Sequence, residues 1–382
     1  MIKRYGVLWL CLVFSLSLNA QTQVGKYVFT EDIDLPFTPY KMQGNTGTCW
    51  SFATHSFWES ELLRIGKGNF DLAEMFVVRH AYEEKAANYI LRQGSARLTQ
   101  GGLAADVLQL IDRYGVVPQQ VYDQQGTPDG KWDHSAMYEE LKAYADSVIE
   151  TQVQGNRVDW RAGVQEILDR YFGPVPPSFT YAGESYTPQI FAAKLGLNPS
   201  DYVTLTSFTH HPFYAPFVLE VPDNWANGAQ YNLPLDAFVQ VIDYALDQGF
   251  TLDWDINTAD IGFSNTLGLA IVPQEDLSGI AIEANDAFMG SKVFQEKEIS
   301  PAYRQEMFES YQVKDDHLVH ITGRVKDQQG RIFYKIKNSS GDGIRPTKGY
   351  LYASLPYVRL HSISILLHKD AIPPGIRAKL HL

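Results

Sequence analysis

Apolar residues in the first two thirds of the chain recur mostly at helical spacing. Between 48 and 66 they fall near positions i, i+3, i+4 and i+7, and glycine and asparagine follow, which predicts a helix with a defined end. The same pattern predicts helices over 103–114, 135–172 and 234–248, with a short strand at 202–208 before the last of them. The front of the chain is therefore expected to be mainly helical.

Beyond residue 316 the pattern changes to short runs rich in β-branched and aromatic residues. Four such runs, at 317–321, 331–336, 350–352 and 362–366, predict strands. A helical front and a β-rich back predict an α+β protein with two lobes. We expect an N-terminal lobe over 21–134, a mostly helical segment over 135–300 and a C-terminal β-rich lobe over 301–382.

The first twenty residues have the pattern of a secretory signal peptide. Lys3 and Arg4 precede an apolar run from Gly6 to Leu18, and the small Ala20 stands before the polar Gln21. An uncleaved anchor helix is the alternative, but an apolar run of about a dozen residues is shorter than the roughly 20 that cross a bilayer. The sequence thus predicts cleavage after Ala20, export to a periplasm or out of the cell, and no stable membrane anchor.

Charge and cysteine content narrow the function. The full chain has a net charge of −12, and cleavage would bring it to −14 because it removes two basic residues and no acidic one. The remaining Lys and Arg residues form no basic stripe, which argues against a nucleic-acid partner. Cleavage would also remove Cys11 and leave Cys49 alone. That thiol cannot form an internal disulfide, so it is a buried bystander, an intermolecular link or a reagent.

Cys49 stands at the predicted start of a helix. There the helix dipole and a nearby imidazolium can lower a thiol pKa from about 8.5 to roughly 3.5–7.5, which supplies a nucleophilic thiolate. The backbone N–H of Cys49 and the side-chain amide of Gln43 are placed to donate to an oxyanion, and Gly44 and Gly47 permit the tight turns that bring the amide back. On these grounds alone, a lone cysteine packed beside Trp50 in an ordinary core is an equally open interpretation.

A cysteine nucleophile needs a histidine to take its proton and a third group to hold the imidazole ring. The strand-like run at 316–323 contains His317 and His320, which lie on opposite faces because strand side chains alternate. Only one of them can face the thiol. Asn338 follows the next predicted strand, in a string that by itself is typical of a turn.

The order of residues around Cys49 resembles the active-site segment of the papain superfamily: Gln, Gly, two residues, Gly, one residue, then Cys-Trp-Ser-Phe. The resemblance implies that Cys49 is the nucleophile and Gln43 an oxyanion donor. It also selects His317 over His320 as the base, because Gly323 follows His317 by six positions as in the family. His320 is then interpreted as a packed strand residue.

Two more segments carry this resemblance. Asn338 opens a string similar to the family's Asn-Ser-Trp-Gly, which implies that its amide orients the ring of His317. Ser340 stands where the family usually has a tryptophan that shields the histidine–asparagine hydrogen bond from water, so we expect this bond to be less covered here. Gly101 and Gly102 resemble the family's Gly-Gly segment, which implies contact with the substrate backbone.

Four longer segments, at 112–118, 171–181, 187–191 and 231–234, are similar to segments of bleomycin hydrolase and aminopeptidase C. Ordinary papain-like enzymes lack the insert that holds the last three. This resemblance implies a papain-like two-lobe α+β fold with a large insert and aminopeptidase activity of the cysteine type on peptide substrates. It further implies neither a cofactor nor a metal, and it allows a homo-oligomer.

Two alternatives within the family stay open. In bleomycin hydrolase-like enzymes a C-terminal arm lies in the cleft and anchors the free amine of the substrate. Residues 363–374 resemble the strand and turn before such an arm, but few residues follow, so an endopeptidase without the blocking arm is the close alternative. A catalytically silent peptide-binding relative is the other. Metallo- or serine-hydrolase motifs are absent from the sequence, and His210 and His211 are expected in an exposed loop.

Overall fold

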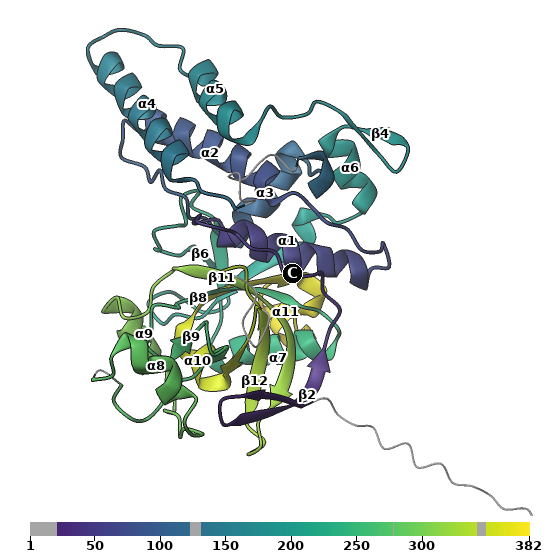
Figure 1. Cartoon of the computed structure of the whole chain (residues 1–382), viewed down its shortest axis with the longest axis vertical. Helices are drawn as coiled ribbons and strands as arrows, with labels where there is room; N and C mark the ends of the chain where they lie inside the picture. The colour runs from purple at the N-terminus through teal and green to yellow at the C-terminus, as the bar shows by residue number, and fades with distance from the viewer. Residues whose placement is uncertain (1–20, 123–130, 278, 342–348) are drawn as a thin grey trace, which may run out of the picture.

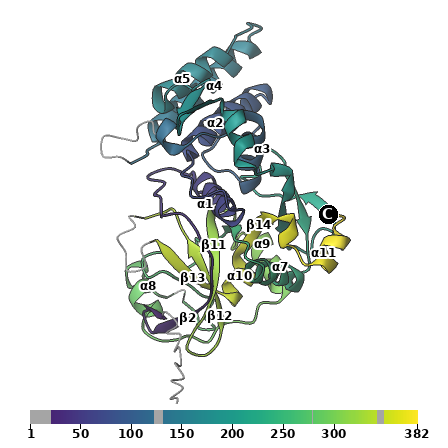
Figure 2. The ribbon, with the colours of Figure 1, turned by 90° about the vertical axis from the view of Figure 1, so that its right-hand side faces the viewer.

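The computed structural model describes residues 21–122, 131–277, 279–341 and 349–382. The expected signal peptide, 1–20, lies outside these residues. Within them, none of the helices combines the length and the apolar character that a membrane crossing needs. A helical lobe sits on a β-rich lobe, and α1 (Cys49–Arg64) runs between the two (Figures 1 and 2).

The helical lobe is built around one buried apolar cluster. Its side chains come mainly from the long helices, and Phe57, Phe76, Val107 and Leu141 are each fully buried in it. The elements of this lobe, besides α1, are α2 (Glu74–Leu91), α3 (Ala104–Tyr114), α4 (Ser135–Val153), α5 (Arg161–Phe172), the hairpin of β3 (Phe179–Tyr181) and β4 (Glu184–Tyr186), and α6 (Pro188–Leu195).

The β-rich lobe is organised by a large sheet with the strand order β6-β7-β5-β14-β8-β11-β12-β13-β10-β9, while β1 pairs with β2 and β2 with β11. The strands are β1 (Gln21–Val24), β2 (Tyr27–Asp34), β5 (Tyr202–Thr206), β6 (Pro216–Val218), β7 (Ala229–Asn232), β8 (Leu252–Ile256), β9 (Phe263–Ser264), β10 (Leu269–Ala270), β11 (His317–Lys326), β12 (Ile332–Lys337), β13 (Tyr350–Ser354) and β14 (Ser362–His368). The helices of this lobe are α7 (Leu235–Asp247), α8 (Ile282–Met289), α9 (Pro301–Glu309), α10 (Leu355–His361) and α11 (Pro374–Lys379). Elsewhere along the described chain, short 3₁₀ turns lie at Gln119–Val121, Pro199–Asp201 and Lys369–Ala371.

Strand β11 changes partner along its length. Its first half, from His317 to Ile321, pairs with β8, and from Gly323 onward it pairs with β2. At the change, a Cβ on Gly323 would lie 2.3 Å from the carbonyl oxygen of Ile33, so only glycine lets β2 approach this closely. The first half of β11 is thereby left between β8 and β12, facing α1.

Most of the predicted elements are confirmed with shifts of one or two residues at their ends, including the helix that begins at Cys49. The strand predicted at 317–321 begins at His317 but extends to Lys326, and the helical segment predicted at 135–172 is divided into α4 and α5. The segment 135–300 is not mostly helical throughout: beyond residue 200 it contributes strands β5 to β10 to the large sheet. Of these strands, only β5 was predicted, because the others are two to five residues long and too short to show a reliable period. Helix α2 was not predicted because its buried residues lie all around it.

Candidate active site

The loop before α1 is fixed by close contacts that only glycines permit. Gly44 has a φ of 69°, and a Cβ on it would lie 2.4 Å from the carbonyl oxygen of Trp132. Gly47 donates its N–H to Oε1 of Gln100 over 2.7 Å. The loop therefore delivers Cys49, which is 7% exposed, at the first position of the helix.

His317 and Asn338 are joined across the start of β11 and the end of β12. Nε2 of His317 lies 2.7 Å from Oδ1 of Asn338, and the same oxygen accepts the N–H of Ser339 over 2.8 Å. Because Oδ1 is an acceptor in both contacts, Nε2 carries the proton and Nδ1 keeps its lone pair. The backbone N–H of Leu318 lies near enough to the thiol of Cys49 to oppose the rise of its pKa, which places the sulfur beside the start of β11.

The hydrogen bond between His317 and Asn338 is covered by a polar contact. The amide nitrogen of Asn338 donates to Oδ1 of Asn265 over 3.1 Å and to Oγ of Ser340 over 2.9 Å. His317 is 9% and Asn338 2% exposed, so both partners of the bond are buried although Ser340 stands at the position of the tryptophan. Asn265 lies between β9 and β10 and belongs to no motif, which is why the sequence did not reveal it.

Gln43 links the loop before α1 to the strand that carries the asparagine. Its Nε2 donates to the carbonyl of Thr46 over 2.7 Å, and its Oε1 accepts the hydroxyl of Ser339 over 2.8 Å. Its backbone N–H also donates to the carbonyl of Ser339 over 2.9 Å. These contacts use one of the two N–H groups of Nε2, and the second is the one that an oxyanion would receive.

Burial has the largest effect on the pKa values of Cys49 and His317. It raises the pKa of the Cys49 thiol to about 12, and the carboxylates of Asp255, Asp223 and Asp315 act in the same direction. Burial also lowers the pKa of His317, against the opposing effect of its bond to Asn338. A lone thiolate is therefore disfavoured, and Cys49 ionises readily only when its proton moves to His317, since an ion pair leaves no net charge buried.

The predicted role of His320 as a packed strand residue fits its surroundings. It is fully buried, its Nδ1 lies 2.8 Å from Oγ of Ser56 on α1, and its ring meets Phe57 edge-on. Burial lowers its pKa well below the usual range. His320 thus holds α1 against β11 behind the candidate catalytic pair.

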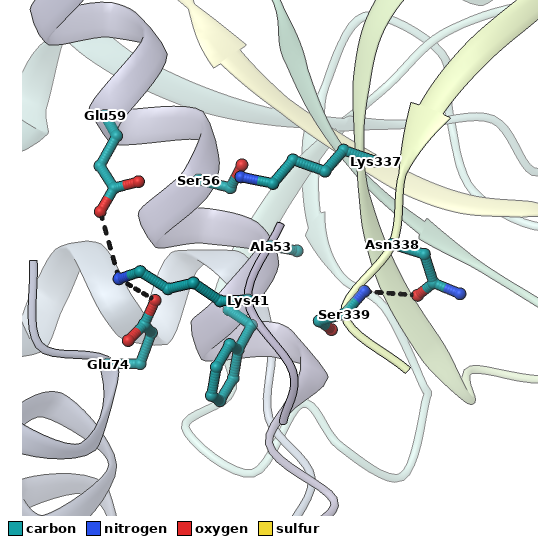
Figure 3. A pocket seen from close by; sticks show the side chains of 9 residues that line it. Lys41, Ala53, Ser56, Glu59, Glu74, Lys337, Asn338 and Ser339 are labelled. Carbon is teal, nitrogen blue, oxygen red and sulfur yellow. Dashed lines mark hydrogen bonds and ion pairs between the residues drawn. The ribbon is translucent and has the colours of Figure 1, made fainter. Parts of the chain in front are cut away.

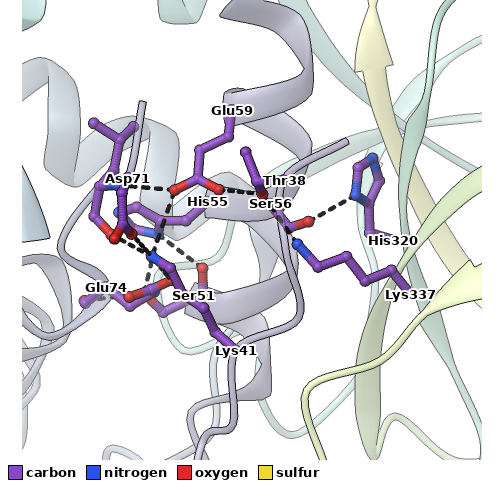
Figure 4. A network of polar contacts seen from close by, with 11 residues as sticks. Thr38, Lys41, Ser51, His55, Ser56, Glu59, Asp71, Glu74, His320 and Lys337 are labelled. Carbon is purple, nitrogen blue, oxygen red and sulfur yellow. Dashed lines mark hydrogen bonds and ion pairs between the residues drawn. The ribbon is translucent and has the colours of Figure 1, made fainter. Parts of the chain in front are cut away.

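A buried polar network continues from this contact (Figure 4). Lys41 forms ion pairs with Glu59, Asp71 and Glu74 at 3.5, 2.5 and 2.7 Å. The hydroxyl of Thr38 donates to Glu59 over 2.5 Å and accepts from Lys337 over 3.1 Å. The network ties the N-terminal segment to both lobes.

A cavity with room for about one water molecule lies within this network and is lined by Lys41, Ser56 and Lys337 among others (Figure 3). Burial lowers the pKa of Lys337 to about 8. Lys337 directly precedes Asn338, so the network also fixes the strand end that presents the asparagine amide.

Gly101 and Gly102 lie against the start of α1, as expected of a segment beside the nucleophile. The indole Nε1 of Trp50 donates to the carbonyl of Gln100 over 3.0 Å, and a Cβ on Gly102 would come within 3.1 Å of the Trp50 ring. Lys85 donates to the carbonyl of Gly101. The segment is therefore held rigidly at the edge of the site.

Among the described residues, one group of side chains could hold a metal ion. His210 and His211 each place Nε2 on a carboxylate oxygen of Glu220, at 3.1 and 2.8 Å. The two histidines are partly exposed, in a turn after β5. The Nε2 hydrogen bonds of these two histidines go to Glu220 and not to Cys49, His317 or Asn338.

Comparisons with known proteins find relatives among the cysteine peptidases. No protein-family model matches the chain. It is 24% identical to aminopeptidase C of Streptococcus thermophilus over 386 residues, which covers 90% of this chain and 83% of that protein. It is 26% identical over 231 residues to the mitochondrial cysteine proteinase 1 of Saccharomyces cerevisiae, covering 49% of this chain and 47% of that protein. The solved structure of PepW from Lactobacillus rhamnosis has the same fold, with a TM-score of 0.70, 18% identity, and coverage of 92% of this chain and 84% of that one.

Proposed function

We propose that this chain, which resembles aminopeptidase C over most of its length, is an exported papain-like cysteine aminopeptidase with Cys49 as nucleophile and His317 as base. The observation that carries the assignment of residues is the hydrogen bond between His317 and Asn338. His317 begins β11, and the backbone N–H of the next residue, Leu318, lies near the Cys49 thiol.

The reaction would proceed through a covalent acyl-enzyme. Nδ1 of His317 takes the thiol proton, and the sulfur of Cys49 attacks the carbonyl carbon of the scissile bond. The resulting oxyanion would receive the backbone N–H of Cys49 and the second N–H of Gln43. His317 then protonates the leaving amine, and the C–N bond breaks.

A water molecule would complete the cycle. His317 takes a proton from the water, which attacks the thioester carbon, and the sulfur leaves as the carboxylic acid forms. Asn338 keeps its contact to Nε2 throughout, so the ring stays oriented with Nδ1 toward the sulfur. Asn338 accordingly acts as a positioning residue.

Labelling with a thiol-directed epoxysuccinyl inhibitor tests the nucleophile. Wild-type protein should be modified once, on Cys49, and lose all peptidase activity, whereas Cys49→Ala should take up no label. A labelled Cys49 in a protein that cleaves no peptide would favour the catalytically silent relative.

The position of cleavage is tested with one fluorogenic peptide in two forms, with a free and with an N-acetylated amine. An aminopeptidase should cleave the free form far faster. Equal rates would establish the endopeptidase alternative.

Export is proposed on the pattern of residues 1–20 alone. Expression of the full chain in a bacterial host, followed by N-terminal sequencing of the exported protein, should give Gln21 as the first residue. Full-length protein retained with the cells would refute the proposal. Native mass measurement in the same preparation would tell a homo-oligomer from a monomer.

A further inference from the structure

A buried carboxyl faces the start of α1 beside the nucleophile. Asp255 lies on β8, directly opposite Leu318, whose N–H lies near the thiol of Cys49. Asp253, two residues earlier on the same face, accepts the hydroxyl of Thr54 on α1 over 2.5 Å, so this face of β8 lies under the helix. Cross-strand neighbours on one face are about 5 Å apart, which places Asp255 next to the site.

Asp255 has no partner among the described residues. It is 2% exposed, and neither carboxylate oxygen has a hydrogen bond or an ion pair there. By contrast, Asp253 is held by Thr54. A buried polar group without partners costs free energy, so a position like this is retained most easily where a ligand supplies the partner.

Two further carboxyls extend from Asp255 toward the edge of the site. Asp315 accepts the backbone N–H of Asp223 over 3.1 Å, and both side chains are partly exposed. The carboxylate of Asp223 lies against Gly101, since a Cβ on that glycine would be 1.9 Å from Oδ2. The acidic cluster of Asp223, Asp255 and Asp315 therefore reaches from the protein interior to the glycine segment expected to contact the substrate.

Two cations, Arg97 and Lys85, lie near the acidic cluster. Arg97 pairs with Asp223 at 3.0 Å. Burial lowers the pKa of Lys85, and the carboxylates of Asp106, Asp223 and Asp315 oppose that shift. Asp316 is bound by the backbone N–H groups of Thr258 and Ala259. In the described part of the chain no ion pair reaches Asp255 or Asp315, so the cluster can accept one more cation.

We propose that this acidic cluster is a subsite for a cationic group of the substrate on the acyl side of the scissile bond, with Asp255 as its innermost ligand. The cation is either the free α-amine of a peptide or the side chain of a lysine or arginine near the cleavage point, both of which are ammonium-like donors. This inference rests on the proposed peptidase function.

The acidity of the cluster gives the proposal a pH signature. Burial raises the pKa of Asp255 well above the usual range, and burial together with Asp223 raises that of Asp315 to about 7. A raised pKa means that the carboxyls carry protons at low pH and ionise as the pH rises. Because the pKa of Asp315 is about 7, preference for a cationic substrate should grow between about pH 5.5 and pH 8, relative to a neutral substrate measured at each pH.

The test uses four aminoacyl fluorogenic amides with lysine or norleucine as the residue before the scissile bond, each with a free or an acetylated α-amine, so that an aminopeptidase and an endopeptidase would release the same fluorophore. For one of the two cations, the side-chain or the α-amine, the wild-type enzyme should have a kcat/KM about tenfold or more above that for the matched neutral compound. The lysine-to-norleucine ratio reports the side chain, and the free-to-acetylated ratio reports the α-amine. Asp255→Asn should bring the preferred ratio close to one.

Asp253→Asn is the matched control, because it changes a buried carboxyl on the same strand face that is bound to Thr54 and should keep the ratio within about twofold of wild type. Ratios near one in the wild-type enzyme, or unchanged by Asp255→Asn, would overturn the proposal. Titration of the Cys49→Ala variant with the same four compounds measures binding without catalysis: the preference should persist there, and equal binding of all four would also overturn the subsite. Absence of hydrolysis in the wild type alongside selective binding would contradict the peptidase function and leave the subsite standing.

Discussion

The ionisation of Cys49 offers the sharpest test of the site. The structure disfavours an isolated thiolate, because burial raises the pKa of the thiol to about 12. An ion pair with His317 removes that penalty. The two situations predict different pH dependences for alkylation by iodoacetamide, a neutral reagent that the surrounding carboxylates do not repel.

The absolute rate is a poor measure of the pair. At pH 6 an unperturbed thiol of pKa about 8.5 is roughly 0.3% thiolate, so full ionisation would speed alkylation about 300-fold. However, thiolate nucleophilicity falls with pKa with a slope of about 0.4–0.5, which cancels about 100-fold of the gain for a thiol of pKa near 4. Only a few-fold difference in rate would remain.

The slope of the pH profile separates the two cases. An ion pair keeps the thiolate fraction constant, so the wild-type rate should change less than about twofold between pH 5.5 and 7.5. In His317→Ala the thiol should titrate with its raised pKa, and the rate should climb about tenfold per pH unit over the same range. His320→Ala is the control and should keep the flat profile, because His320 contacts Ser56 on α1 and not the nucleophile.

A steep profile in the wild type would refute the ion pair in the resting enzyme and mean that the proton moves only after substrate binds. A steep profile in His320→Ala together with a flat one in His317→Ala would show that the base is the other histidine. Circular dichroism of each variant confirms that the comparison is made on folded protein.

Three further changes test two residues of the site and one buried residue of the β-rich lobe. Gln43→Ala should lower kcat by about 100-fold or more through loss of one oxyanion donor, with little change in KM, and equal losses in both would contradict that role. Ser340→Ala should lower kcat about fivefold by removing one hydrogen bond to the Asn338 amide, while Ser340→Thr, which keeps the hydroxyl, should restore it. Arg304→Met should cost more than about 3 kcal/mol in urea unfolding, because four backbone carbonyls lose their buried donor, whereas the same change at the exposed Arg170 should cost less than about 1 kcal/mol.

The sequence predicted the elements that carry the site better than the contacts that complete it. The helix that begins at Cys49 could be predicted because its apolar residues recur at helical spacing and glycines stand before and after it. The strand that begins at His317 could be predicted because the apolar pattern changes there. The pairing of His317 with Asn338 followed from family resemblance, and the structure brings the two within 2.7 Å.

Contacts between distant segments could not be predicted. Asn265 reaches Asn338 across 73 residues, and Asp255 meets the site only because β8 pairs with β11. Asn265 stands in no motif. Asp255 lies in a short run of alternating apolar and acidic residues, but such a run does not tell which strand lies beside it, because strand order is set by long-range packing. The place of the family tryptophan shows the same limit: Ser340 was identified, but its polar partner was not.

The interface beneath α1 has a consequence for how accurately the two lobes are aligned. A helix on a purely apolar surface can shift by one turn, about 5.4 Å, and still bury similar area. Here Thr54 meets Asp253 and Ser56 meets His320, so a slip of one turn would break both hydrogen bonds in a dry environment. These two contacts therefore fix the position of α1 along its axis. The sulfur at the start of the helix is thereby kept at a constant position relative to His317, which belongs to the other lobe.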